Sequence, residues 1–163
     1  MWQALLNLFG RGPQPLAIGA PAPVLTAPDE EGRPVDLGEV YARGLTLLYF
    51  YPMADTPGCT VQSCSLRDGM ADLQRMGVTV LGVSHETPAA QKKFKEKHGL
   101  PFTLLADREG KVIEAFGVPT IAFGIPWRQS FLIKNGKVAW RSLSAQTETH
   151  AEEVRRAIAA LPT

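Results

Sequence analysis

Two continuous apolar runs constrain the fold of this chain more than any other feature of its sequence. Leu45–Phe50 and Val78–Val83 each contain a single threonine among apolar and aromatic residues, and Phe102–Leu105 is a shorter run of the same kind. Runs of this type are typical of strands that are buried on both faces of a sheet. Helical segments alternate with them, so the sequence predicts an α/β fold with a central mixed sheet flanked by helices.

Three segments have helical character. Cys59–Met76 is predicted to be one helix that ends at Gly77, because its apolar side chains have roughly helical spacing at Val61, Cys64, Met70, Leu73 and Met76. Pro88–His98 follows Thr87, a favourable N-cap with proline in the first turn, and precedes Gly99. The last predicted helix covers about residues 150–161, and its expected inward side chains are Ala151, Val154, Ile158 and Leu161.

Two pairs of short segments indicate β-hairpins. Val24–Thr26 and Pro34–Leu37 flank a polar stretch that contains a glycine, which predicts an N-terminal hairpin. Ser130–Ile133 and Lys137–Trp140 are joined by Asn135–Gly136, the dipeptide that favours a type I′ turn. The second hairpin therefore adds antiparallel strands to the predicted sheet.

Size and charge limit the functions that this chain can have. With 163 residues it is expected to form one domain, residues 16–163, preceded by an extension over residues 1–15. The formal net charge is +1, which gives no strong attraction to nucleic acid or to an anionic membrane. No run of 18 apolar residues is present, so we expect neither a nucleic-acid nor a membrane partner.

The extension itself has a regular pattern. Trp2, Leu5, Leu6 and Phe9 follow the spacing of one helical face, and no lysine or arginine precedes them, unlike in a secretory signal. Arg11–Pro15 contains Gly12 and Pro13 and would end such a helix. The segment is predicted to be a short helix docked on the body of the protein or, alternatively, a contact to a partner or a membrane surface.

The chain has only two cysteines, Cys59 and Cys64. A secreted disulfide scaffold carries more, and the three histidines His85, His98 and His150 lack zinc-ligand spacing to them. We therefore expect a reducing compartment, the cytoplasm, in which the two cysteines are either buried and inert or redox-active.

Cys59 lies at a helix start that follows a buried strand. The first run ends at Tyr51–Pro52, a loop follows, and Thr56–Pro57 is a favourable N-cap and first helical residue. Cys59 is then the third residue of the helix, close to the positive end of its dipole. This position favours the thiolate, which is the reactive form of cysteine.

The helix dipole alone is not enough to ionise a cysteine fully. It contributes about 0.3–2 kcal/mol, which leaves a thiol of ordinary acidity at best about half ionised at neutral pH. A second positive group is therefore expected near Cys59. Arg67 lies about 12 Å further along the same helix, whereas Arg128 precedes a strand of the sheet and is the better candidate.

The segment P-x-x-x-T-P-G-C, from Pro52 to Cys59, resembles the active-site motif of the peroxiredoxins. Because Cys64 follows Cys59 by five positions, the chain resembles in particular the Q branch, also called bacterioferritin comigratory proteins. Further segments agree in order and spacing over roughly residues 18–159: Val80–Ser84, Gly99–Phe102 and Ser130–Ile133. The resemblance implies a thioredoxin-like fold. Gly117–Trp127 is shorter than expected for this branch.

The resemblance also implies a role for each residue of the site. Cys59 would attack the peroxide and become a sulfenic acid, and Cys64 would resolve it to an intramolecular disulfide. Thr56 would hydrogen-bond the peroxide, Pro52 would shield the sulfur, and Arg128 would stabilise the thiolate and the transition state. The implied activity is reduction of hydrogen peroxide and organic hydroperoxides without a cofactor. Thioredoxin or a similar dithiol would recycle an enzyme that is a monomer or a homodimer.

Other interpretations stay open at this point. A redox sensor would use the same two cysteines, and a thiol–disulfide exchange protein is disfavoured because Thr56 occupies the first position of a C-x-x-C motif. Cys64 could be a core residue, Arg67 a structural ion-pair partner and His85 a solvated loop residue. The lysines of Pro88–His98 are interpreted as a solvated helix face.

Overall fold

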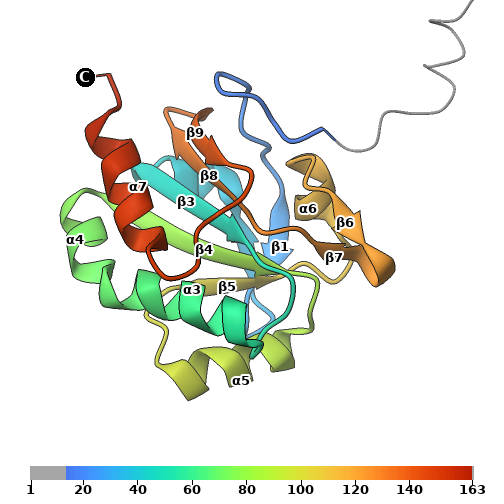
Figure 1. Ribbon diagram of the computed structural model, residues 1–163. Coiled ribbons are helices and arrows are strands. Elements are labelled where there is room, and N and C mark those ends of the chain that lie inside the picture. The colour runs from blue at the N-terminus through green and yellow to red at the C-terminus, as the bar shows by residue number, and fades with distance from the viewer. Residues whose placement is uncertain (1–13, 163) are drawn as a thin grey trace, which may run out of the picture.

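A five-stranded mixed sheet forms the centre of the computed structural model, which describes residues 14–162 (Figure 1). Its strands, in the spatial order β5-β4-β3-β8-β9, are Thr103–Ala106, Val78–Ser84, Leu45–Phe50, Gln129–Lys134 and Lys137–Ser142. β3, β4 and β5 run parallel, whereas β8 and β9 are antiparallel to their neighbours. The prediction of an α/β fold with a mixed sheet is confirmed.

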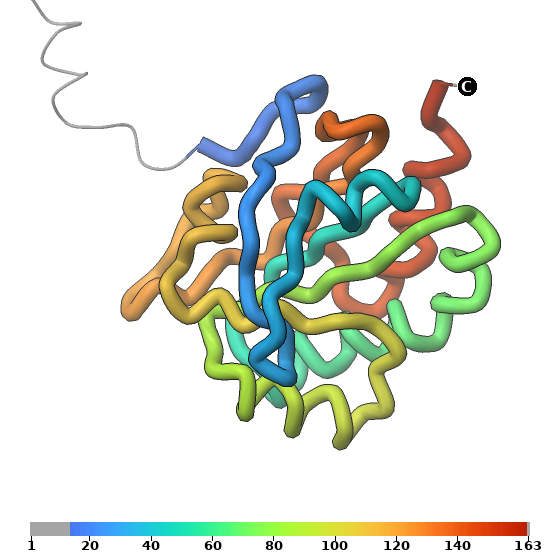
Figure 2. Tube along the Cα trace, turned by 180° about the vertical axis from the view of Figure 1, so that it is seen from behind, coloured from blue at the N-terminus to red at the C-terminus, as the bar shows by residue number. Residues whose placement is uncertain are grey.

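Helices cover both faces of this sheet. Their bounds are Leu37–Tyr41 (α2), Pro57–Asp68 (α3), Met70–Arg75 (α4), Pro88–His98 (α5), Lys111–Ala115 (α6) and His150–Ala159 (α7). Side chains of α3, α4, α5 and α7 share one apolar core with one sheet face, and those of α2 and α6 share a second core with the other face (Figures 1 and 2). The two-layer cover explains why the central strands carry apolar residues on both sides.

The register of β3 decides what lies at the end of the sheet where the cysteines are found. Phe50, the last residue of β3, is opposite Val83 of the parallel strand β4 and opposite Gln129 of the antiparallel strand β8. The end of β3 therefore meets the beginning of β8. Residues that follow Phe50 in the sequence come close to residues that precede Gln129.

Both predicted hairpins are present, with shifted bounds at the first. β1 (Thr26–Pro28) pairs with β2 (Pro34–Asp36), so the first strand begins two residues later than predicted. In the second hairpin, Asn135 and Gly136 have φ angles of 52° and 73°, the positive values that a type I′ turn needs.

The prediction of one helix over Cys59–Met76 is wrong. The segment forms α3 and α4, which are separated at Gly69, and Gly77 follows α4 with a φ angle of 78°. A Cβ atom on Gly69 would lie only 2.7 Å from Cβ of Ala151 in α7. Glycine at this position allows α7 to approach the α3–α4 junction closely.

The apolar residues of this segment do not all face the core. Val61 and Met76 are 41% and 36% exposed, whereas Gln62, Ser63 and Leu66 are buried beside Cys59. The two polar residues are buried because each has a partner. Arg128 donates to Gln62, and Ser63 shares a hydrogen bond with the hydroxyl group of Tyr49 at 3.0 Å. Hydrogen-bonded polar groups can lie in a core where apolar periodicity predicts none.

The two remaining helix predictions agree with the structure. Thr87 Oγ1 accepts a hydrogen bond from the Ala90 N–H at 3.2 Å, and Gly99 ends α5 with a φ angle of 59°. α7 ends at Ala159, two residues before the predicted end. Its inward residues Ala151 and Val154 are buried, and Ile158 and Leu161 pack against the same core.

Residues 117–127 contain a small hairpin that sequence reasoning did not predict. β6 (Thr120–Ile121) pairs with β7 (Ile125–Pro126), and the 3₁₀ turn η1 (Ala122–Gly124) joins them. This β6–β7 hairpin projects from the body beside α6 (Figures 1 and 2). In residues 14–162 no helix has the length and apolar character needed to cross a membrane. The helix predicted at Trp2–Phe9 lies outside the described residues.

Candidate active site

The predicted position of Cys59 at a helix start is confirmed. Thr56 is the N-cap of α3 with extended backbone, and Cys59 is the third helical residue. The Thr60 N–H donates the first bond of the helix, to the Thr56 carbonyl at 2.8 Å. The N–H groups of Gly58 and Cys59 precede this bond and have no acceptor within the helix, so they give the site a positive local potential.

Arg128 supplies the second positive group at the fully buried Cys59. Its Nη2 donates to Cys59 Sγ at 3.4 Å, and its Nη1 donates to Gln62 Oε1 at 2.6 Å. A guanidinium group with two such contacts is held in one orientation. A thiolate at this position faces a helix N-terminus and a fixed cation together.

The sheet and a glycine explain how Arg128 reaches a sulfur 69 residues away. Arg128 immediately precedes Gln129, which lies opposite Phe50 at the end of β3, and α3 starts a short loop after Phe50. A Cβ atom on Gly58 would be 3.1 Å from Arg128 Nη2. Glycine before Cys59 therefore leaves room for the guanidinium group against the first turn of the helix.

Gln62 is a site residue that sequence reasoning missed. It lies one turn after Cys59 on the same face of α3, is fully buried and orients Arg128 through its amide oxygen. The spacing of three residues from the cysteine was the only available signal. A polar residue one turn after such a cysteine can be either an exposed residue or a site residue, and only the position of its partner decides between the two.

The Thr56 side chain does not cap the helix. Its hydroxyl group donates to the Met53 carbonyl at 2.7 Å, inside the loop that joins β3 to α3. With its hydrogen used in this way, the hydroxyl oxygen retains lone pairs that can accept from a bound molecule. Pro52, in the same loop, lines a hollow together with Arg128.

Two anchors hold the loop between Pro52 and Thr56. Glu86 Oε1 accepts from the Ala54 N–H at 2.8 Å. Asp55 has a positive φ angle of 60°, and its carboxylate pairs with Lys97 at 2.9 Å and His98 at 3.2 Å. Hydrogen bonds from Lys97 and then His98 hold the pKa of Asp55 below its usual value. The loop is thus attached to Glu86, which precedes α5, and to the C-terminal end of α5.

These anchors modify the interpretation of the α5 lysines as a solvated face. Lys97 pairs with the active-site loop, and Lys95 pairs with Glu30, which is only 7% exposed and also accepts from the Leu104 N–H at 3.2 Å. The lysine side of α5 therefore joins α5 to the N-terminal hairpin and to the loop before α3.

The other candidate residues lie apart from the thiol of Cys59. Cys64 is partly buried, and both cysteines are free thiols. Arg67 donates to Asp68 at 3.0 Å and to the His98 carbonyl at 2.7 Å, in agreement with the structural role weighed for it. His85 is partly buried rather than fully solvated, because its ring lies against Gly124 of the β6–β7 hairpin.

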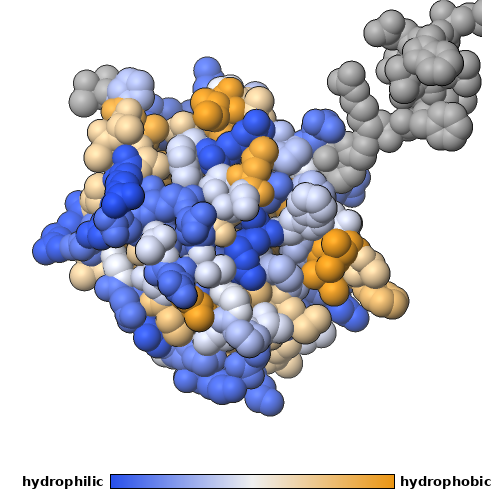
Figure 3. Space-filling view, in the orientation of Figure 1, coloured by the Kyte–Doolittle hydropathy of each residue, from blue (hydrophilic) through white to orange (hydrophobic). Residues whose placement is uncertain are grey.

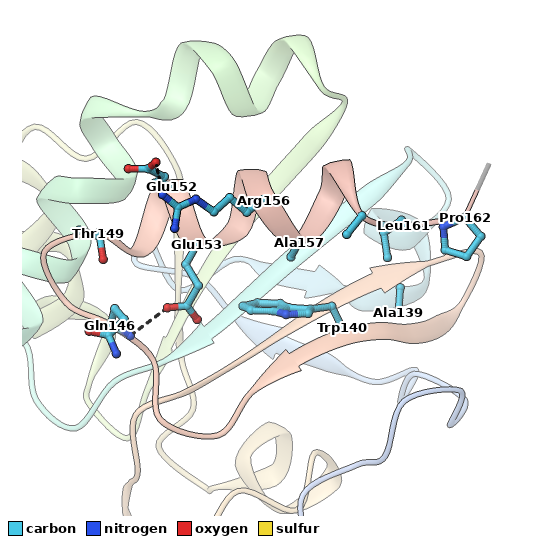
Figure 4. A pocket seen from close by; sticks show the side chains of 11 residues that line it. Ala139, Trp140, Gln146, Thr149, Glu152, Glu153, Arg156, Ala157, Leu161 and Pro162 are labelled. Atoms are coloured by element: carbon cyan, nitrogen blue, oxygen red, sulfur yellow. Dashed lines mark hydrogen bonds and ion pairs between the residues drawn. The ribbon is translucent and has the colours of Figure 1, made fainter.

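Two surface hollows are relevant to the position of the active site. The one beside Arg128 has a volume of about 390 Å³ and is lined by Pro52, Ile121, Pro126, Trp127, Arg128, Leu143, Ser144 and Ala145. A larger one of about 580 Å³ lies between β9 and α7, with the Trp140 ring on its floor (Figure 4). No residue of the candidate site lines the larger hollow, so size alone points to the wrong place.

The Glu86 contact gives the loop a testable dependence on pH. Burial raises the pKa of Glu86 above its ordinary 4.5, although the Ala54 N–H opposes the shift. The folded protein then binds this proton more tightly than the unfolded chain, so the Glu86 contribution to stability falls as the pH rises through this range. Glu86→Gln keeps an acceptor without the charge. We expect its stability relative to the original protein to increase between about pH 4 and about pH 7.

Urea unfolding at the two pH values measures this difference. Glu148→Gln is the matched control, because it makes the same substitution at an exposed residue. A stability difference between Glu86→Gln and the original protein that is the same at both pH values would contradict the assignment.

Comparisons with known proteins agree with this geometry. The AhpC/TSA family matches residues 18–141. The chloroplastic peroxiredoxin Q of Sedum lineare is 38% identical over 146 residues, which cover 88% of this chain and 78% of that protein. Peroxiredoxin Bcp of Escherichia coli (strain K12) is 48% identical over 104 residues, which cover 64% of this chain and 66% of that protein.

Solved structures of peroxiredoxins share the fold of this chain. The peroxidoxin BcpB of Mycobacterium tuberculosis has a TM-score of 0.85 at 29% identity, covering 91% of this chain and 99% of that one. The peroxiredoxin Q of Xanthomonas campestris has a TM-score of 0.76 at 26% identity, covering 83% and 90%. The sheet and helices therefore form the thioredoxin-like fold that the resemblance implied. This chain belongs to the AhpC/TSA family, and within it to the peroxiredoxins of the Q type.

Proposed function

We propose that Cys59 is the peroxide-reducing nucleophile of this chain and that Arg128 activates it. As a Q-type peroxiredoxin the chain is a thiol-dependent peroxidase, with a peroxide substrate and a thiol reductant. The observation that carries the assignment is the 3.4 Å contact from Arg128 Nη2 to Cys59 Sγ at the start of α3. Both the guanidinium group and the helix end favour the thiolate, which is the attacking species.

In the proposed first step the Cys59 thiolate attacks the oxygen of the peroxide that carries hydrogen. The S–O bond forms as the O–O bond breaks, so sulfur is oxidised by two electrons to a sulfenic acid. The other oxygen leaves as an alkoxide or hydroxide and takes up a proton to become an alcohol or water. Negative charge develops on that leaving oxygen. Arg128, already fixed by Gln62, is placed to donate to it without reorganising.

Thr56 and Pro52 complete the proposed peroxide site. Because the Thr56 hydroxyl donates to the Met53 carbonyl, its oxygen is left as an acceptor for the O–H of the bound peroxide. This orients the peroxide with its hydrogen-bearing oxygen defined. Pro52 lines the hollow beside Arg128 and would limit the access of water to the sulfur.

The second proposed step joins Cys59 to Cys64. The Cys64 thiol attacks the sulfenic acid sulfur, a disulfide forms, and water leaves. Thioredoxin or a similar dithiol then reduces this disulfide by exchange and becomes oxidised itself. Because both sulfurs belong to one chain, we propose a monomer as the working unit. The need for a dithiol reductant leads us to place it in the cytoplasm.

The disulfide cannot form on an intact α3. Two residues five positions apart on a helix have Cα atoms about 8.7 Å apart and point about 140° away from each other. A disulfide requires Cα atoms within about 7 Å. The first turns of α3 must therefore unwind after the sulfenic acid forms. This step would set how often excess peroxide oxidises Cys59 further.

The contacts of α3 indicate where unwinding stops. Before Cys64 the helix is held by the buried Cys59 side chain and by polar contacts, from Gln62 to Arg128 and from Ser63 to Tyr49. From Ser65 onward α7 holds it, because Ser65 Oγ accepts from the Ala151 N–H at 3.2 Å and Leu66 is buried in the core. We infer that residues 57–64 unwind and that the rest of α3 stays in place.

Substitution of the two cysteines tests the proposed function. Cys59→Ser is expected to abolish peroxide reduction, while Cys64→Ser keeps a single turnover, because attack needs only the first sulfur and recycling needs both. Peroxide consumption with thioredoxin supplied measures both. A burst of peroxide reduction in Cys59→Ser would refute the assignment. Insulin reduction without peroxide turnover would favour a thiol–disulfide exchange protein, and a single oxidation without turnover would favour a redox sensor.

Arg128→Met is expected to slow peroxide attack about 10- to 100-fold, since a hydrogen bond to a charged group contributes about 1.5–3 kcal/mol. It should also reduce the thiolate fraction of Cys59 at neutral pH, seen in the ultraviolet absorbance. Gln62→Leu is expected to give a smaller loss, because the cation remains but loses its orienting partner. Arg67→Met is the matched control and should change the rate less than about two-fold. Equal losses in Arg128→Met and Arg67→Met would contradict the assignment.

Hydrogen exchange tests the extent of unwinding. On conversion to the disulfide form, the amides of residues 59–64 should lose protection, whereas those of residues 66–73 should keep it. Mass spectrometry of peptides from both forms resolves the two groups, with the Cys64→Ser variant as a control that cannot form the bond. A confirmed Cys59–Cys64 disulfide with unchanged protection over residues 59–64 would contradict the inference, and loss of protection over all of α3 would contradict its boundary.

A further inference from the structure

Asp55 is the last residue before α3 whose side chain forms a polar contact with another helix. Its carboxylate lies 2.9 Å from Lys97 Nζ and 3.2 Å from His98 Nε2. Both partners belong to the last turn of α5, which lies next to α3 on the same face of the sheet (Figure 1). Thr56, the next residue, makes its side-chain hydrogen bond within the loop. We call the contacts of Asp55 with Lys97 and His98 the Asp55 anchor.

The backbone of Asp55 depends on this anchor. Its φ angle of 60° lies in the left-handed region, which is costly for residues other than glycine, although aspartate adopts it more readily than most. In this conformation the chain turns from the loop into Thr56, the N-cap of α3. A costly backbone conformation persists where the surrounding contacts hold it. The Asp55 anchor thus holds the turn from which α3 begins.

The end of α5 that provides the anchor is itself fixed. The rings of His98 and Phe94 pack with their centroids 5.3 Å apart, and Phe94 is buried in the core that α3 and α5 share. The His98 carbonyl accepts from Arg67 Nη1 at 2.7 Å. Carbonyl groups of the last helical turn have no acceptor role within the helix, so a cation is favourable there. Residues 57–64, which are proposed to unwind, are therefore preceded and followed by contacts to the same helix end.

The anchor is of a strength that changes an equilibrium without preventing either form. The side chains of Asp55 and Lys97 are 44% and 55% exposed, and Figure 3 shows hydrophilic side chains over α5. An ion pair with this exposure changes an equilibrium by about five-fold at most. The helical form of residues 57–64 needs the turn at Asp55, whereas the unwound form gains conformational freedom when the turn is released. Loss of the anchor therefore favours unwinding.

We propose that Asp55 is a positioning residue: its contacts with α5 hold the start of α3 in the helical form and so set the fate of the Cys59 sulfenic acid. This inference rests on the proposed function. In one fate the Cys64 thiol attacks the sulfenic acid, which forms the disulfide and releases water. In the other a second peroxide transfers one oxygen atom to the sulfur, which gives a sulfinic acid and leaves water or an alcohol. Only disulfide formation requires unwinding, so the anchor favours the sulfinic acid.

Hydrogen exchange of the reduced, full-length protein tests the anchor without peroxide. Asp55→Asn removes the charge, and asparagine tolerates the positive φ angle. In this variant we expect the amides of residues 60–64 to exchange about two- to five-fold faster, whereas those of residues 66–73 do not change. Lys97→Met should have the same effect, and Lys97→Arg should keep the original exchange rate because it keeps the charge.

Two matched controls separate the anchor from surface charge in general. Asp72→Asn makes the same substitution at an aspartate that pairs with two arginines, and Lys92→Met removes another exposed ion pair of α5. Neither should change exchange at residues 60–64. Unchanged exchange there in Asp55→Asn would overturn the proposal. An equal increase in the controls, or an increase over residues 66–73 as well, would show a general loss of stability and would also overturn it.

Overoxidation measures the consequence for catalysis. With thioredoxin in excess, the hydrogen peroxide concentration that converts half of Cys59 to the sulfinic acid should be about two- to five-fold higher in Asp55→Asn than in the original protein. Mass spectrometry detects the two added oxygen atoms. The measurement compares two fates of one sulfenic acid, so a smaller folded fraction does not change it. Asp72→Asn should leave this concentration unchanged.

An equal or lower peroxide concentration in Asp55→Asn would overturn the role of Asp55 in the fate of the sulfenic acid. Failure of the proposed function gives a different result. If the original protein reduces no peroxide, the proposed function fails, whereas hydrogen exchange of the reduced protein still decides whether Asp55 holds the start of α3.

Discussion

The antiparallel pairing of β3 with β8 is the interaction on which the site depends. It places Gln129 opposite Phe50, and therefore sets Arg128 against the loop and helix that follow β3. Neither the loop nor α3 contains a cation that reaches Cys59 in the structure, so the reactive sulfur relies on a residue from the other half of the chain. A shift of one residue in this register would turn Arg128 to the opposite face of the sheet. The apolar packing of both sheet faces, which fixes the register, is thus also what fixes the chemistry.

The same helix has to satisfy two opposed requirements. In the proposed cycle, peroxide attack needs α3 intact, because the helix end and the Gln62–Arg128 contact hold positive charge at the sulfur. Formation of the proposed disulfide requires the first two turns of α3 to unwind. The contacts differ along the helix: the buried Cys59 and two polar contacts hold the first turns, whereas the Ser65 contact to α7 and the burial of Leu66 hold the remainder. Gly69 contributes by allowing α7 to lie close to the fixed part.

Local signals in the sequence predicted local structure well. The type I′ turn was predicted correctly from Asn135–Gly136, and the ends of α5 from Thr87 and Gly99. The position of Cys59 as the third residue of α3 was predicted from Thr56–Pro57. What failed depended on distant partners. Gln62 and Ser63 are buried because of Arg128 and Tyr49, and Gly69 divides α3 from α4 where Ala151 of α7 comes close. Residues 120–126 form a hairpin without any apolar alternation. Such contacts leave no periodic trace in the chain. The pairing of Arg128 with Cys59 was expected only through a family resemblance and a shortfall of positive charge.

Burial of Tyr49 favours the return of residues 57–64 to the helix after the proposed unwinding. Tyr49 is fully buried, and this burial raises the pKa of its hydroxyl group well above the usual value, so the group stays neutral and must find a hydrogen-bond partner. In the reduced protein that partner is Ser63, at 3.0 Å. Unwinding of residues 57–64 would remove Ser63 and leave a buried hydroxyl without it, at a cost of about 1–3 kcal/mol. As long as the disulfide holds the chain open, the cost is retained. Once a dithiol has reduced the bond, the same cost favours rewinding, which restores both the Tyr49 contact and the Arg128 contact to Cys59. In the proposed cycle, the buried tyrosine therefore links reduction of the disulfide to recovery of the reactive thiolate.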